Sequence, residues 1–151
     1  MSQLYDLYKA SGNETFAQKV CEIAPYFSTI DPHFEILKPG YCEVTMPNTV
    51  KVHNHLGTVH AIAMCNLAEI AAGIMTDVSI PENSRWIPIG MKVQYLAPAK
   101  TSLRGVADGT SIDWSQPGDI DVPVAIYDER GTVVCQAHIT VKISSKKDTR
   151  T

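Results

Sequence analysis

Residues 54–75, with the sequence NHLGTVHAIAMCNLAEIAAGIM, decide the fold of this 151-residue chain. A polar loop containing Gly57 leads into a segment, residues 61–75, in which only Asn66 and Glu69 have polar side chains. A helix that is apolar nearly all round belongs in a protein core. The carboxylate of Glu69 is costly to bury there unless it is paired, protonated or used in chemistry. The sequence therefore predicts a central buried helix that carries one candidate functional carboxylate.

The rest of the chain provides elements that can cover this helix. N-terminal helices are predicted over about residues 2–24, and from residue 33 onward apolar side chains alternate as they do in strands. We expect strands over residues 34–37, 42–46, 87–96, 103–107, 122–127 and 132–143. Short connections favour antiparallel neighbours, and the apolar face of such a sheet must be covered. We predict one α+β domain over residues 1–151, in which a curved antiparallel sheet wraps around the helix.

Composition argues against several classes of function. The formal net charge of −3 gives no reason to expect binding to nucleic acid or to a membrane surface. Asn66 and Glu69 interrupt the best candidate for a transmembrane span. The four cysteines are scattered and form no C-x-x-C motif, which predicts reduced thiols and a cytoplasmic protein.

Residues 54–69 contain a spaced pattern of Asn54, Gly57-Thr58, His60-Ala61-Ile62 and Leu67-Ala68-Glu69. This pattern resembles the signature of the hotdog-fold, PaaI-like acyl-CoA thioesterases, and the chain is most similar to their uncharacterised, DUF4442-like branch. That signature has Asn, Gly-Thr, His-Gly-Gly and Leu-Ala-Asp at the same spacings. The resemblance covers about residues 33–143 and implies a hotdog core there. It also implies a homodimer or a dimer of dimers, with coenzyme A present only as part of the substrate and no separate cofactor.

The resemblance implies hydrolysis of a fatty-acyl or aryl-acyl thioester. Glu69 would be the base or nucleophile, the Ala61 N–H at the helix start the oxyanion donor, and Asn54 a water-orienting or substrate-binding group. Further candidates for substrate binding are Gly57, His60, Ile62 and Asn66. Glu69 follows Ala61 by eight residues, about 12 Å along one helix. The resemblance therefore implies that each site takes Glu69 from one subunit and the helix start from the other.

Two departures from the signature favour an alternative function. Ala61 and Ile62 stand where the relatives have two glycines, and their side chains could crowd the approach to the helix start. A dimer that binds acyl-CoA or another apolar ligand without turnover is therefore the first alternative. A hydratase or dehydratase is a weaker one, because no catalytic His paired with an acid is evident.

Structural interpretations of the same residues also remain open. Asn54 could only shape its loop, His60 could hold the loop and Asn66 could satisfy a neighbouring polar group. His53, His55 and His60 lack an acidic or Cys ligand at convincing spacing, so we expect no metal site.

Overall fold

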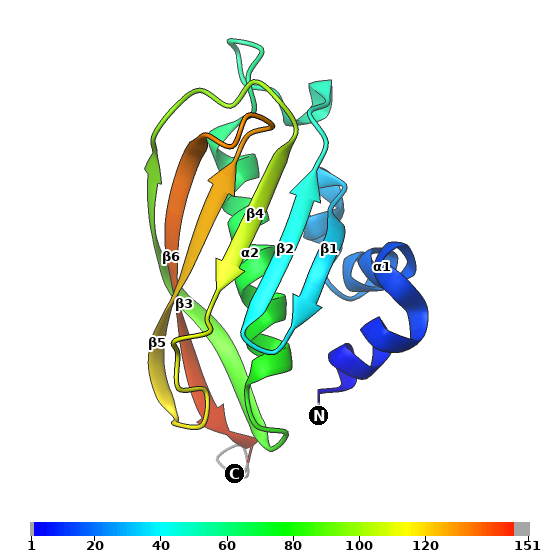
Figure 1. Ribbon diagram of the computed structural model, residues 1–151, viewed down its shortest axis with the longest axis vertical. Helices are drawn as coiled ribbons and strands as arrows, with labels where there is room; N and C mark the ends of the chain where they lie inside the picture. Colours follow the sequence, from blue (N-terminus) through cyan, green and yellow to red (C-terminus); the bar gives the residue numbers. More distant parts are fainter. Residues whose placement is uncertain (1, 147–151) are drawn as a thin grey trace.

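The computed structural model describes residues 2–146, and within them six strands form one antiparallel sheet that curves around a helix (Figure 1). In sheet order the strands are β1 (His33–Lys38), β2 (Tyr41–Met46), β4 (Leu103–Asp108), β5 (Gly118–Tyr127), β6 (Val133–Ser145) and β3 (Ser84–Tyr95). Every neighbouring pair is antiparallel, and short connections join three of these pairs, β1 to β2, β4 to β5 and β5 to β6. The predicted hotdog architecture of a sheet wrapped around a central helix is confirmed.

The central helix is α2 (Ala61–Ser79), and it lies in the curve of the sheet. Its sheet-facing side chains, such as Leu67 and Met75, are fully buried. Close approach of helix and sheet is possible because β4 contains Gly105, where an added Cβ would lie 3.0 Å from Leu67 Cγ. The helix runs one turn beyond the predicted end at Met75. Thr76 lies in this added turn, and its hydroxyl donates to the Ala72 carbonyl at 2.8 Å, so this buried polar side chain is satisfied within the helix.

The sequence argument against a membrane span was too strong for α2. Its 19 residues are long and apolar enough to cross a bilayer by length and composition, despite Asn66 and Glu69. Burial identifies it as a core helix, because 67% of that apolar stretch is buried within the protein.

Helix α1 (Gln3–Ile23) and the short 3-10 helices η1 (Pro25–Ile30) and η2 (Val50–Val52) complete the described elements. Two N-terminal helices are predicted, and Gly12 marks their junction, since its φ of 80° is not helical. The structure adds η1, which the sequence does not predict. Both α1 and η1 contact α2, and α1 also packs on β1 (Figure 1). They cover part of the surface of α2 that the sheet leaves open.

Strand β3 lies at an edge of the sheet, where Pro88 is tolerated because it has no N–H to donate to a ladder, and a bulge follows this proline. Its alternating apolar residues do not form a buried face. The large apolar side chains exposed on this strand and just after it are Ile87, Ile89, Met91, Tyr95 and Leu96. An edge strand with this surface is a ready site for pairing with another chain.

Candidate functional site

The start of α2 presents a backbone donor that bonds to no other described residue. His60 is the N-cap, and its Nδ1 accepts a hydrogen bond from the Ile62 N–H at 3.0 Å. The N–H groups of Ala63 and Met64 both donate to the His60 carbonyl. The Ala61 N–H is left free, at the positive end of the helix dipole. An N–H in this setting can stabilise a developing oxyanion.

The loop before α2 is held by Asn54. The Asn54 Oδ1 accepts hydrogen bonds from the N–H groups of Leu56 and Thr58, and its Nδ2 donates to Thr58 Oγ1 at 2.8 Å. Gly57 adopts a φ of 77°, and its N–H donates to the Asn54 carbonyl. The loop-shaping role of Asn54 is therefore present in the structure. One Nδ2 hydrogen remains available for a substrate carbonyl, because a side-chain amide has two donors.

Glu69 lies on α2, two turns after its start, and is partly buried. Burial raises the pKa of the Glu69 carboxyl above its ordinary value, because a charged carboxylate is disfavoured away from water. One turn earlier, Cys65 Sγ lies 3.4 Å from the Tyr95 hydroxyl of β3. This hydrogen bond is the main reason that the pKa of Tyr95 is raised to about 12. Sequence reasoning missed Tyr95, because strand alternation does not show which helix residue a strand side chain meets.

Three of the four predicted substrate-binding residues line one pocket of about 200 Å³. They are His60, Ile62 and Asn66, and η1 and η2 supply the opposite walls. The Asn66 amide donates to Thr29 Oγ1 at 3.0 Å, so it also joins α2 to η1. This contact confirms that Asn66 satisfies a neighbouring polar group, while its contact with substrate stays a prediction.

The histidines near the loop have structural partners. His53 Nε2 lies 2.6 Å from Asn48 Oδ1, and His60 Nδ1 is engaged by the helix start. This supports the structural interpretation of His60.

The structure does not bring Glu69 and the helix start together within one chain. Both belong to a single straight helix, on which eight residues span about 12 Å. When a carbonyl oxygen accepts the Ala61 N–H, its carbon atom is therefore out of reach of the Glu69 carboxylate of the same α2. One chain by itself therefore does not bring the Ala61 N–H and the Glu69 carboxylate to the same carbon atom.

Comparisons with known proteins agree with this architecture. The model of a family described as a domain of unknown function, DUF4442, matches residues 12–143. A crystal structure from structural genomics, APC5556, is 50% identical, with 95% of this chain and 97% of that chain covered and a TM-score of 0.87.

Two more distant structures share the fold. Thioesterase HI1161 from Haemophilus influenzae is 14% identical, with 93% and 96% of the two chains covered and a TM-score of 0.79. PA5026 from Pseudomonas aeruginosa, a probable thioesterase, is 23% identical, with coverage of 83% and 90% and a TM-score of 0.74. A comparison with curated proteins found no match. The chain belongs to the DUF4442 family and has the hotdog fold of these thioesterase structures.

Proposed function

We propose that this protein is an acyl-CoA thioesterase that hydrolyses a fatty-acyl or aryl-acyl thioester. The observation that carries the proposal is the presence on α2 of two groups suited to acyl transfer, about 12 Å apart along the helix. One is the free N–H of Ala61 at the helix start, and the other is the partly buried Glu69, whose pKa is raised by burial. The first is an oxyanion donor and the second a base or nucleophile, which are the two groups that acyl transfer needs.

The chemistry balances with water as the only co-substrate. The Ala61 N–H donates to the thioester oxygen while Glu69 takes a proton from the attacking water. If Glu69 instead attacks the carbonyl carbon itself, loss of the thiolate leaves a mixed anhydride on Glu69, and water then hydrolyses this anhydride to release the acid and free the carboxylate. The new C–O bond forms and the C–S bond breaks, and the thiolate of coenzyme A leaves and takes up a proton. The raised pKa of Glu69 makes it a stronger base as long as it stays ionised at the working pH.

A second copy of the chain is the proposed source of the missing group in each site. Edge strand β3 exposes apolar side chains, with Ile87 59% and Ile89 49% exposed. Pairing of this edge with a second copy would cover them and extend the sheet. The proposed functional unit is therefore a homodimer or a dimer of dimers, in which Glu69 of one subunit faces the helix start of its partner.

One observation favours the rival function, an acyl-CoA-binding dimer without turnover. Ile62 is 53% exposed beside the helix start, and the methyl of Ala61 lies where the PaaI-like signature has a glycine. Both groups narrow the approach to the Ala61 N–H.

The test compares the wild type with Glu69→Gln across a panel of acyl-CoAs, with a thiol-detecting reagent. Glu22→Gln, on the exposed surface of α1, is the matched control for the loss of a carboxylate. We expect thiol release by the wild type and by Glu22→Gln, and its loss in Glu69→Gln. Equal background release by all three proteins would exclude hydrolysis, and tight binding with that result would support the rival.

Mixing two inactive variants tests whether the sites are shared. Ala61→Pro removes the N–H, and Pro is tolerated at the first position of a helix. The preceding residue, His60, has a φ of −63° and a ψ of 139°, which suit a following proline. Random mixing with Glu69→Gln makes about half of the dimers mixed, each with one intact site, so about a quarter of wild-type activity should return. No recovery, with mixed dimers shown to form, would contradict shared sites.

A further inference from the structure

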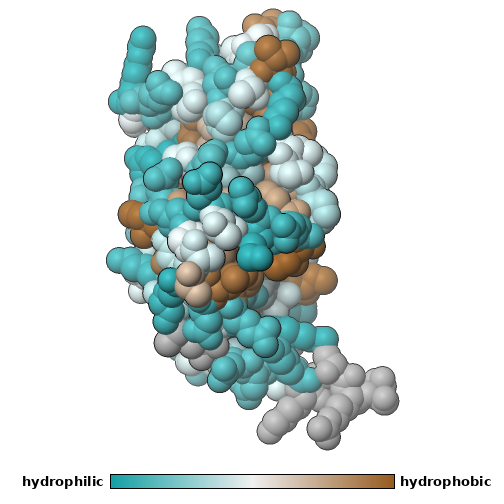
Figure 2. Space-filling view, turned by 90° about the vertical axis from the view of Figure 1, so that its right-hand side faces the viewer, coloured by the Kyte–Doolittle hydropathy of each residue, from teal (hydrophilic) through white to brown (hydrophobic). Residues whose placement is uncertain are grey.

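An apolar cavity of about 240 Å³ lies between α1, η1, α2 and the start of β3. Its apolar walls are formed by Leu4, Val20, Ile23, Phe27, Ile74 and Trp86. An apolar cavity of about 150 Å³ is enough to hold benzene, so this one can hold a larger hydrocarbon group. Figure 2 shows hydrophobic side chains gathered among hydrophilic ones on the face that carries α1. Ile23 is 70% exposed there, which the packing of α1 does not explain.

The one charged residue in the lining of this cavity is already engaged. Asp77 Oδ1 accepts the indole N–H of Trp86 at 3.0 Å, and Asp77 Oδ2 accepts the hydroxyl of Ser2 at 3.1 Å. These bonds join β3 and the start of α1 to α2. The cavity is therefore suited to an apolar group and offers little to a charged one.

The cavity also lies close to the proposed catalytic carboxylate. Gly73 and Ile74, which line it, follow Glu69 by four and five residues on α2, about 6 to 8 Å along the helix. Gly73 and Glu69 share one face of the helix, since residues four apart are neighbours. A chain leading from a carbonyl at Glu69 along this face reaches the cavity.

Trp86 forms a fixed wall of the cavity. A Cβ on residue 73 would lie 2.8 Å from Trp86 Cη2, so the glycine lets the indole lie directly against α2. The hydrogen bond to Asp77 holds the indole in this position.

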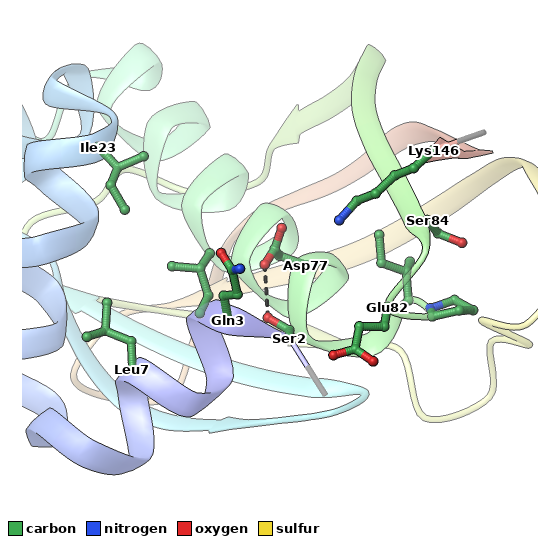
Figure 3. A pocket seen from close by; sticks show the side chains of 11 residues that line it. Ser2, Gln3, Leu7, Ile23, Asp77, Glu82, Ser84 and Lys146 are labelled. Carbon is green, nitrogen blue, oxygen red and sulfur yellow. Dashed lines mark hydrogen bonds between the residues drawn. The ribbon is translucent and has the colours of Figure 1, made fainter. Parts of the chain in front are cut away.

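A second hollow of about 430 Å³ adjoins the cavity and shares Leu4, Ile23 and Asp77 with it (Figure 3). Its lining is mixed, because the apolar side chains of Leu7, Ile80 and Pro81 stand beside the polar ones of Ser2, Gln3, Glu82, Ser84 and Lys146. An alkyl chain that extends past the apolar cavity would enter this mixed lining, where further methylenes lose less water-exposed surface.

From these observations we propose that the cavity between α1, η1 and α2 binds the acyl group of the substrate, and that Trp86 limits its length. The identity of the ligand as an acyl thioester rests on the proposed function. Affinity should rise about fourfold for each added methylene until the cavity is full, and then level off.

The experiment uses Trp86 as its own probe. The chain has two tryptophans, so Trp114→Phe leaves Trp86 as the single emitter. Trp114 lies outside the lining of the cavity, with its indole N–H bonded to the Gly109 carbonyl. Acyl-CoAs of increasing length are titrated into Trp114→Phe/Glu69→Gln, with free coenzyme A as the blank. We expect a saturable change in Trp86 emission that depends on chain length.

Two variants and one control locate the bound group. Ala24→Phe fills the cavity, and Ile23→Gln makes its exposed wall polar with little risk to folding. Ala10→Phe adds the same side chain on the exposed surface of α1, outside the cavity lining. The affinity measured from the Trp86 emission should fall at least tenfold in the first two variants, and its dependence on chain length should be lost. Both should persist in the control.

The outcomes separate this proposal from the proposed function. A length-dependent response lost in Ala24→Phe and Ile23→Gln supports the cavity, even if no thiol is released by the wild type. Thiol release by the wild type, with affinity and length preference unchanged in both variants, overturns the acyl cavity and leaves the thioesterase standing. Absence of any response of Trp86 to every acyl-CoA also overturns it.

Discussion

His60 Nδ1 accepts a hydrogen bond from the Ile62 N–H at 3.0 Å, so an imidazole serves as the N-cap of α2. This single contact satisfies the second N–H of the helix and leaves the first, that of Ala61, free for a ligand. The structure of the helix start and its proposed chemistry thus depend on the same side chain.

His60→Ala should lower the free energy of unfolding by about 0.5–2 kcal/mol, because the Ile62 N–H loses its acceptor. Denaturant titration measures this loss. His60→Asn supplies another capping oxygen and should keep most of the stability. Equal stability of the alanine variant and the wild type would show that the cap is energetically unimportant.

Ala61→Pro should reduce kcat by roughly 10²- to 10³-fold, because it removes one oxyanion donor while the helix start tolerates proline. Ala61→Gly keeps the N–H and removes only the methyl, so it should retain activity. Steady-state hydrolysis of an acyl-CoA checks both variants, with circular dichroism as the test of folding. Full activity in the proline variant would exclude the Ala61 N–H as the donor.

The stability of Glu69→Gln relative to the wild type should depend on pH. Burial raises the pKa of Glu69 in the folded state, so folding favours the protonated carboxyl. The contribution of protonated Glu69 to the stability of the wild type is fully present below the unfolded-state pKa. It is lost as the pH rises through the folded-state pKa. Glutamine mimics the protonated form, so the variant should gain stability relative to the wild type as the pH rises from the unfolded-state pKa of glutamate, about 4.3, through the raised folded-state pKa.

Unfolding titrations across this range measure that difference. Glu22→Gln, on the exposed surface of α1, is the control and should show no such trend. A loss of stability of Glu69→Gln relative to the wild type as the pH rises would contradict the effect of burial.

Gly73→Ala should destabilise the protein by about 1–3 kcal/mol, although alanine is the better helix former, because the new Cβ meets the Trp86 indole. Trp86→Phe removes that ring edge, so the double variant should lose less than the two single variants added together. Thermal or denaturant unfolding measures the four proteins. Gly90→Ala, where an added Cβ meets nothing within 4 Å, is the control. Additive losses would show that residues 73 and 86 do not interact.

Ile89→Lys should weaken self-association roughly tenfold or more, because it places a charge on the exposed apolar edge of β3. Sedimentation or light scattering over a concentration series measures this effect, and thioesterase activity should fall with the dimer. Gln94→Lys, at an exposed polar position of β3, is the control for added charge. A wild-type protein that is monomeric at all concentrations would contradict the proposed dimer.

Much of the fold follows from patterns that are local in the sequence. The apolar segment after Val59 predicted α2, and alternation predicted the strands. The last turn of α2 was missed because Thr76 and Asp77 are polar and interrupt the apolar pattern. The 3-10 helix η1 was missed because six residues, two turns of such a helix, are too few to show a period. Similarly, the alternation of β3 shows two faces but not that one of them is left exposed.

The residues of the candidate site also fall into those that the sequence could name and those that it could not. Glu69 and Ala61 could be named from residue type and spacing, because both lie on one helix. Tyr95 and Trp86 could not, because Tyr95 meets Cys65 and Trp86 meets Asp77 across separate elements. Asn66 could be named, but only the structure shows that its amide bonds to Thr29 of η1.

By itself the sequence determined a central apolar helix, a spaced Asn-Gly-His pattern before its start and a carboxylate two turns on, because helical period and residue type are local properties. Only the tertiary structure decided that the Ala61 N–H is free, that burial raises the pKa of Glu69, and that α1 leaves an apolar cavity against Gly73. These features depend on which surfaces meet, and packing between segments distant in the chain sets them.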